Sequence, residues 1–224
     1  MMRVALYWAP RVDDPLHALG SSWLGRDAET GATLAQPAIP GLDIAALTAD
    51  ARGYGLHATL KPPFRIATSW QAVRDAAMEL AARTRPFAMP ALRLAEHHGF
   101  LALLEAEKSA PLQAFCDACV TALDPHRSPA TAEEIARRNP ARMTERQRAY
   151  LDRWGYHYVL DEWWFHVTLS GRLTEEQRAV VMPLLAAHLG DAPALPRRVT
   201  ELCLFTQASP GAPFLIAERL PLLG

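Results

Sequence analysis

Lysine, cysteine and long apolar runs are all scarce in this 224-residue sequence. Three cysteines cannot supply a four-thiolate zinc site, and no apolar run approaches the roughly 20 residues of a transmembrane helix. The apolar stretch at the N-terminus is too short for a signal peptide, so we expect a cytoplasmic protein without a membrane partner. A net charge of -1 leaves no overall field that would attract duplex nucleic acid. Any site for a polyanion must therefore be local.

Familiar motifs of nucleotide and hydrolase chemistry are also missing. The glycine-containing stretch over 20–27 lacks the spacing of a P-loop, so a glycine-rich phosphate cradle is not supported there. Neither an H-E-x-x-H helix nor a G-x-S-x-G elbow occurs, which disfavours zinc and serine hydrolases. Cys116 and Cys119 form a C-x-x-C on the apolar face of a helix predicted over 109–123, and we expect both thiols in the core.

Basic residues are almost all arginine, 21 of 23, and the two exceptions are Lys61 and Lys108. A lysine ammonium is a compact point charge, unlike the planar guanidinium, and it suits a phosphate oxygen. Lys61 directly follows the first of two histidine motifs described next. The sequence therefore predicts a phosphate contact for Lys61, with chance as the alternative, since Lys108 has no such context.

Two segments 109 residues apart both read His-x-Thr-apolar, His57 to Leu60 and His166 to Leu169. In a strand, successive side chains point to opposite faces, so each histidine shares a face with its threonine. The opposite face of each strand is apolar. Two such strands side by side would bring two imidazoles and two hydroxyls, Thr59 and Thr168, onto one small anionic group. One copy alone would mean little.

The sequence around each motif follows the same order. A capping box at Thr68–Gln71 predicts a helix after the first motif, and one at Thr174–Gln177 predicts a helix after the second. A hairpin pattern follows each helix, with turns at 97–99 and 209–211. The order strand, helix, hairpin therefore occurs twice, which indicates a duplicated unit with a pseudo-two-fold axis.

The segment 124–155 separates the two copies and differs from both. It contains seven arginines, and a third capping box at Thr144–Gln147 predicts a helix over about 145–154. We divide the chain into lobe one, about 1–123, this insertion, and lobe two, about 156–224, within a single domain. The insertion is interpreted either as a solvated helical segment or as an arginine-lined rim that draws an anionic substrate inward.

Most of the other histidines have unremarkable surroundings in the sequence. His157 lies close to the second motif and is a candidate for substrate contact, although histidine flanked by aromatics is commonly a packing residue. The remaining ones lie in predicted loops, at a turn or near a helix end: His17, His97, His98, His126 and His188. We assign no function to them.

The paired HATL and HVTL resemble the two H-x-[ST]-x signatures of the 2H phosphoesterase superfamily, which includes RNA ligase-like cyclic phosphodiesterases. The flanking sequences 54–64 and 164–169 look most like an uncharacterised branch encoded beside phosphonate-utilisation genes. This resemblance implies a bilobal α+β fold in which two antiparallel sheets form a central groove and helices pack outside. It extends over nearly the whole chain.

The resemblance also implies the activity, that of a metal-independent phosphoesterase of the 2H cyclic phosphodiesterase type, a hydrolase without cofactor. His57 and His166 would act as general base and general acid, and Thr59 and Thr168 would bind the non-bridging oxygens. Which histidine has which role is left open, as are the reaction direction and the oligomeric state. A small phosphorylated substrate, such as a cyclic phosphate of phosphonate metabolism, is the expected partner.

The two half-sites are not equivalent, because Lys61 follows one motif and Arg172 the other. Both could bind a second phosphate or phosphonate group of the substrate. Two alternatives to a small substrate remain. An RNA end with a 2′,3′-cyclic phosphate would be favoured if Tyr7, Trp8, Tyr156 or Trp164 stacks on bases in the groove. A non-catalytic module that binds a phosphate ligand would retain the same groove.

Overall fold

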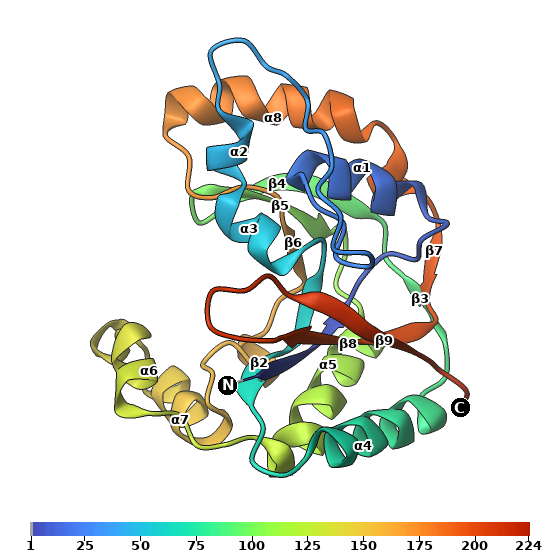
Figure 1. The fold of residues 1–224 in the computed structure, drawn as a ribbon, viewed down its shortest axis with the longest axis vertical. Helices are drawn as coiled ribbons and strands as arrows, with labels where there is room; N and C mark the ends of the chain where they lie inside the picture. The colour runs from blue at the N-terminus through green and yellow to red at the C-terminus, as the bar shows by residue number, and fades with distance from the viewer. Residues whose placement is uncertain (1) are drawn as a thin grey trace.

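A seven-stranded antiparallel sheet runs through the middle of the structure, a computed structural model that describes residues 2–224 (Figure 1). Its strand order is β4-β5-β6-β2-β1-β8-β9, and β3 and β7 form a separate two-stranded ribbon. The strands are β1 Arg3–Trp8, β2 Ala58–Arg65, β3 Phe87–Met89, β4 Leu92–His97, β5 Phe100–Glu105, β6 His166–Thr168, β7 Arg197–Val199, β8 Glu201–Gln207 and β9 Leu215–Pro221.

Helices cover the sheet at both ends of the molecule. Figure 1 shows α1 and α8 at the end that holds β4 and β5, and α4 and α5 at the end that holds β8 and β9. The helices are α1 Pro15–Leu24, α2 Ile44–Leu47, α3 Ala49–Tyr54, α4 Trp70–Arg83, α5 Ala110–Leu123, α6 Ala132–Arg137, α7 Glu145–Trp154 and α8 Glu175–Leu189. Four short 3-10 helices, η1 Asp124–His126, η2 Pro140–Arg142, η3 Leu160–Glu162 and η4 Ala192–Ala194, join them. The predicted α+β class is confirmed.

The predicted duplication is visible in the order of elements. The series β2, α4, β3, β4, β5 is repeated as β6, α8, β7, β8, β9. The two copies are also joined by strand pairing, because β5, from the β4–β5 hairpin of the first copy, pairs with β6 of the second. Equivalent strands meet as well, β2 with β6 and β3 with β7. The copies are therefore interlocked through the sheet.

One part of the expected architecture is wrong. We expected two antiparallel sheets with a groove between them, whereas β4, β5 and β2 of the first copy and β6, β8 and β9 of the second belong to one open sheet, with only β3 and β7 outside it. The reason is the antiparallel pairing of β2 and β6 at Ala58 and Val167, which joins the two halves edge to edge. The division into two lobes and an insertion remains a prediction.

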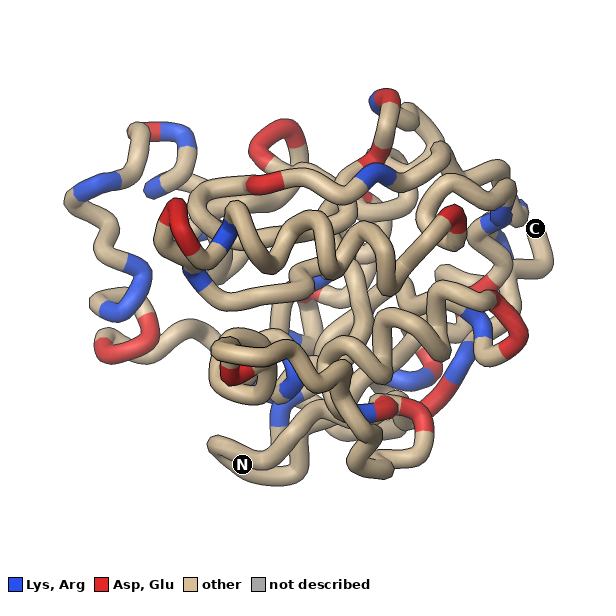
Figure 2. Tube along the Cα trace, turned by 90° about the horizontal axis from the view of Figure 1, so that it is seen from above, with Lys and Arg blue, Asp and Glu red and all other residues tan. Residues whose placement is uncertain are grey.

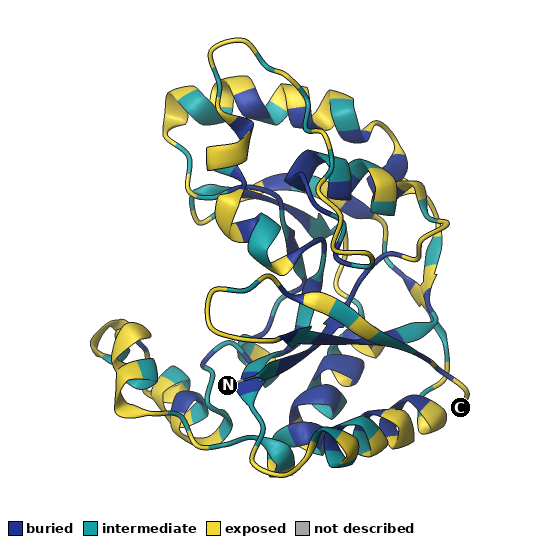
Figure 3. Cartoon of the chain, in the orientation of Figure 1, coloured by how far each residue is buried: buried dark blue, intermediate teal, exposed yellow. Residues whose placement is uncertain are grey.

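The core lies against the apolar face of the central strands. Ala58, Leu60, Val167 and Leu169 are all at most 1% exposed, as the alternation of each motif predicts. Helix α5 packs on this face and buries Cys116 and Cys119, which are free thiols. The expected core role of the two cysteines is confirmed. Figure 3 shows the same pattern, with buried strands inside and exposed outer faces on the helices.

The helix starts follow the capping signals with one difference. Thr144–Gln147 and Thr174–Gln177 form the predicted capping boxes at α7 and α8. At α4 the cap is Ser69, whose hydroxyl accepts a hydrogen bond from the Ala72 amide, so the expected box at Thr68 is wrong. A serine one position later satisfies the same free amide groups, and the helix begins at Trp70.

A shift of register in β2 changes the direction of Lys61. Leu6 faces Lys61 and the next residue, Tyr7, faces Thr59, so Leu60 is an extra residue in the ladder with β1. The shift turns Lys61 toward α5, where its ammonium donates a hydrogen bond to the Val120 carbonyl at 2.8 Å. Asp124 lies 3.5 Å away, and the side chain is almost fully buried. Burial lowers the pKa of Lys61 to about 8, although the Asp124 carboxylate opposes the shift.

We predict that Lys61→Ala lowers the free energy of unfolding by about 2–3 kcal/mol, because it opens a cavity and leaves the Val120 carbonyl without its partner. Lys108→Ala is the matched control, since Lys108 is 80% exposed and should change stability by less than about 0.5 kcal/mol. Urea unfolding of both variants measures the difference. Equal stability of the two would contradict the structural role of Lys61.

Candidate functional site

The two histidine motifs meet where β2 and β6 pair. Ala58 lies opposite Val167 in this antiparallel pair, so the register places His57 opposite Thr168 and Thr59 opposite His166. All four side chains lie on the face opposite the core and are partly buried. Each histidine therefore has the other motif's threonine as its cross-strand neighbour, as the duplication predicts.

Both imidazoles are fixed in the same way. His57 Nδ1 lies 2.9 Å from the Gly55 carbonyl, and His166 Nδ1 lies 3.1 Å from the Trp164 carbonyl, each two residues earlier in the chain. A carbonyl oxygen only accepts, so Nδ1 donates its proton in both rings, and Nε2 of a neutral ring has a free lone pair. The Thr59 hydroxyl lies 3.4 Å from His57 Nε2 and can donate to it. The site thus presents two neutral proton acceptors.

Gly55 is the backbone position that orients His57. Its φ of 81° and ψ of 178° form a combination that favours glycine, and a Cβ added there would lie 2.5 Å from the Ala28 Cβ. The carbonyl that holds His57 Nδ1 belongs to this residue. The glycine of the Gly55-Leu56-His57 sequence is therefore needed for the orientation of the imidazole.

Two aromatic rings stack on the imidazole of His57. Tyr7 is fully buried and stacks on the imidazole with ring centroids 3.9 Å apart, and Tyr54 lies 5.8 Å away on a nearly parallel plane. Burial raises the pKa of Tyr7 well above its ordinary value, so its hydroxyl stays protonated. Within residues 2–224 this buried hydroxyl has no hydrogen-bond partner that meets normal geometry. A polar ligand in the site could provide one.

Both histidines are hard to protonate in the free protein. The pKa of His57 falls from 6.5 to about 4, mainly because the ring is buried; the Gly55 hydrogen bond opposes the shift and the nearby His166 contributes to it. Burial also lowers the pKa of His166, with a further lowering from His97. An anion placed between the rings would raise both values, because an opposite charge favours the imidazolium form.

A cavity of about 230 Å³ opens beside these side chains. His57, Thr59 and Thr168 line it, while His166 lies next to it and is not a lining residue. The other lining residues come from α3, the end of β2, the insertion and the residue that follows it: Asp50, Ala51, Tyr54, Pro62, Pro63, Arg138 and Tyr156, with Tyr7 stacked on His57. This volume suits a small ligand with a polar end and a few apolar contacts.

Three residues predicted to contact the substrate lie elsewhere. Lys61 is turned to the opposite face by the register shift in β2 and is bonded to Val120 and Asp124, so it is not a phosphate contact in this structure. Arg172 is exposed beside the Gly99 turn, and His157 is buried against Tyr158 with ring centroids 3.9 Å apart. Neither residue lines the cavity. Tyr7 is the predicted substrate contact that the structure places there.

Two contributors to the cavity were missed by the motif analysis. Tyr54 stands three residues before His57, at the end of α3 where Gly55 adopts a positive φ, and it lines the cavity. Arg138 comes from the arginine-rich insertion and lies 4.6 Å over the ring of Tyr156. The arginine content of the insertion was a signal, but the sequence could not show which arginine lines the cavity beside His57.

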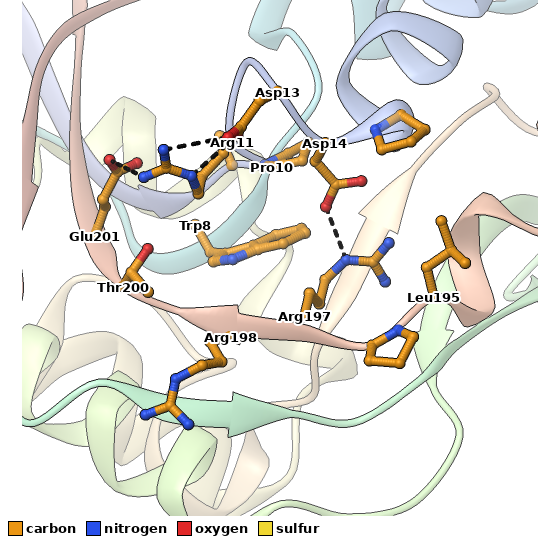
Figure 4. Close-up of a pocket in the computed structure, with 13 residues that line it drawn as sticks. Trp8, Pro10, Arg11, Asp13, Asp14, Leu195, Arg197, Arg198, Thr200 and Glu201 are labelled. Carbon is orange, nitrogen blue, oxygen red and sulfur yellow. Dashed lines mark hydrogen bonds and ion pairs between the residues drawn. The ribbon is translucent and has the colours of Figure 1, made fainter.

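A different cavity, of about 400 Å³, lies where β1 ends (Figure 4). Its charged lining residues are balanced, with three arginines and three carboxylates. Arg197 pairs with Asp14 at 3.0 Å, and Arg11 pairs with Asp13 and Glu201. These internal ion pairs leave no excess charge for a ligand, so we do not consider it the functional site.

Two features are absent from the part of the chain that the structure describes. Within residues 2–224, no three histidine, cysteine or acidic side chains are grouped so that they could hold a metal ion. Over the same residues, none of the helices combines the length and apolar character needed to cross a membrane.

Comparison with known proteins identifies the family. Residues 59–215 match the family described as "Protein of unknown function (DUF1045)". The chain belongs to this family. Two similar relatives are each named ribose 1,5-bisphosphate phosphokinase PhnN. One, from Janthinobacterium sp. (strain Marseille), is 35% identical over 233 residues, which cover 100% of this chain and 51% of the relative. The other, from Laribacter hongkongensis (strain HLHK9), is 34% identical over 228 residues, which cover 99% and 52%.

These names agree with the expected association with phosphonate utilisation and correct the expected activity. The relatives are named as phosphokinases, which transfer a phosphoryl group, so the expectation of a hydrolase of the cyclic phosphodiesterase type is contradicted. This DUF1045 chain spans about half the length of both relatives. The name of the relatives therefore suggests ribose bisphosphates as a class of ligand. It does not show that this chain has kinase activity.

The lowered pKa of His57 predicts a pH-dependent loss of stability. Below pH 6.5 the unfolded chain protonates this histidine and the folded chain does not until about pH 4, so stability falls as the pH falls between these values. Between pH 7 and pH 5 the free energy of unfolding of the wild type should therefore fall by about 2 kcal/mol more than that of His57→Gln. Denaturant unfolding of wild type and variant at both pH values measures it. The same pH dependence in both proteins would show that His57 titrates normally.

Proposed function

We propose that the cavity beside His57 binds a phosphorylated pentose of the ribose bisphosphate class. Its phosphate would contact the four side chains that β2 and β6 present on one face. These are the histidines His57 and His166 and the threonines Thr59 and Thr168. The main support is the cross-strand placement of two imidazoles and two hydroxyls, of which His57, Thr59 and Thr168 line a cavity of about 230 Å³. The names of the two relatives supply the ligand class.

The polar groups of the site suit a phosphate. The hydroxyls of Thr59 and Thr168 can donate to its oxygens, and each histidine can do so from Nε2 once it is protonated. Because Nδ1 is already bonded to a carbonyl in both rings, protonation adds a donor at Nε2 without rotation of the ring. Phosphate binding should therefore be accompanied by the uptake of a proton at neutral pH.

The remaining walls suit the sugar. Tyr54 and Tyr156 line the cavity with apolar ring surface, and so does Tyr7, whose hydroxyl has no hydrogen-bond partner within residues 2–224. A pentose has carbon faces that pack on aromatic rings and hydroxyls that need partners. These groups make the cavity better suited to a sugar phosphate than to inorganic phosphate alone.

The proposal is limited to sugar-phosphate binding and to proton transfer at the bound phosphate. A P-loop, with its G-x-x-x-x-G-K-[ST] spacing, does not occur in the sequence, so nothing in the chain points to that mode of nucleotide binding. The similarity of HATL and HVTL to the 2H signatures supports the same four side chains as the ligand contacts. This similarity does not make hydrolysis of a cyclic phosphate the proposed activity.

Calorimetric titration with ribose 5-phosphate tests the proposal. We expect binding with net proton uptake at pH 7, measured in two buffers of different ionisation enthalpy, and weaker binding as the pH rises. His57→Gln and His166→Gln should each weaken binding by about tenfold or more, because each removes a charge-assisted hydrogen bond.

His188→Gln is the matched control. His188 lies on α8 and is bonded to Ser22 and to the Leu19 carbonyl, away from the cavity, so the variant should bind like wild type. Failure of the wild-type protein to bind any ribose phosphate would refute the proposal, and so would equal losses in all three variants.

A further inference from the structure

A basic cavity of about 350 Å³ adjoins the histidine cavity. The two share Tyr54, Pro63 and Arg138 as lining residues, so a ligand in one reaches the edge of the other. The basic cavity lies between the strand ends of β1 and β2 and the insertion that contains α6. Figure 2 shows the blue segments of this insertion on the arm at the side of the molecule.

The charge of this cavity is strongly one-sided. Five arginines and one glutamate line it, in contrast to the balanced charges of the cavity at the end of β1. The arginines are Arg3, Arg65, Arg127, Arg137 and Arg138, and the glutamate is Glu134. Such an excess in a chain with a net charge of -1 is a local concentration of positive charge.

Two of these arginines are engaged in holding the walls. Arg65 bonds both the Glu134 carboxylate, at 3.2 Å, and the Pro129 carbonyl. Arg127 donates to Asp124 at 2.8 Å and to the Arg153 carbonyl at 3.0 Å. These contacts attach the insertion to the sheet and use most of the donors of both side chains.

The others keep donors available. Arg3 uses Nε for Gln207 at 2.7 Å and its guanidinium lies 5.5 Å over the Phe214 ring, while its terminal nitrogens have no hydrogen bond or ion pair to the described residues. Arg137 has no ion pair or side-chain hydrogen bond within residues 2–224, and Arg138 stacks on Tyr156 without an acid partner there. Three guanidinium groups with free donors around one cavity are well suited to a second anion.

We infer that the basic cavity is a second phosphate subsite, so that the chain binds a bisphosphate across the two cavities. One phosphate of the sugar lies at the histidines and the other contacts Arg137 and Arg138. This inference rests on the proposed function, because the first phosphate defines the position of the second. It replaces Lys61 and Arg172, which the structure places elsewhere, as the source of the second phosphate contact.

The test compares ribose 1,5-bisphosphate with ribose 5-phosphate by calorimetric titration. The wild-type chain should bind the bisphosphate at least about tenfold more tightly, and the difference should shrink as salt is raised. Arg137→Gln and the double variant Arg137→Gln/Arg138→Gln should weaken bisphosphate binding by about tenfold or more. For Arg137→Gln, binding of ribose 5-phosphate should change by less than about threefold.

Arg142→Gln is the matched control, since Arg142 is an exposed arginine of the same insertion that lines neither cavity. The circular dichroism spectrum of each variant is compared with that of the wild type to check that the variant is folded. If wild type binds both sugars equally tightly, or Arg142→Gln weakens the bisphosphate as much as Arg137→Gln, the subsite is refuted while the proposed function stands. If wild type binds neither sugar, the proposed function fails and the subsite fails with it.

Discussion

The short antiparallel pairing of β2 with β6 is the contact on which the site depends. At Ala58 and Val167 it joins two halves of the chain whose elements follow the same order, and it fixes their register. The same register that buries Ala58 and Val167 in the core brings His57, Thr59, His166 and Thr168 to the other face. A slip of one residue would exchange the two faces and bury the polar groups, so the apolar core specifies the geometry of the site.

The two half-sites share their backbone design and differ in their surroundings. In both, a carbonyl two residues earlier holds Nδ1 and leaves Nε2 free. His57 stacks on Tyr7 and borders the cavity, whereas His166 lies beside Trp164 and His97, outside the cavity lining. The positive charge is also one-sided, because the insertion carries arginines to the His57 side. A ligand with one phosphate at the histidines would therefore extend toward α6.

The motif faces, the duplicated element order and two of the three capping boxes were predictable because they depend on local periodicity. Position Lys61 shows the limit of such reasoning. Strict alternation places it on the face of His57 and Thr59, and a single extra residue in the pairing with β1 turns it into the core. The pairing of β5 with β6 between the copies and the position of Arg138 at the cavity depend on long-range packing. Such packing cannot be deduced from a single sequence. The activity predicted from the two four-residue motifs is contradicted by the names of the relatives.

We expect His57 and His166 to be neutral in the free protein, protonated on Nδ1, and to become charged when a phosphate lies between them. Nitrogen-15 NMR of the histidine rings is the decisive measurement, because the shifts of Nδ1 and Nε2 report tautomer and charge for each ring. We predict an unprotonated Nε2 in both rings at pH 7, a pKa of His57 of about 4, and protonation of Nε2 on addition of ribose 5-phosphate. Ordinary titration near pH 6.5 with no response to the sugar phosphate would contradict it.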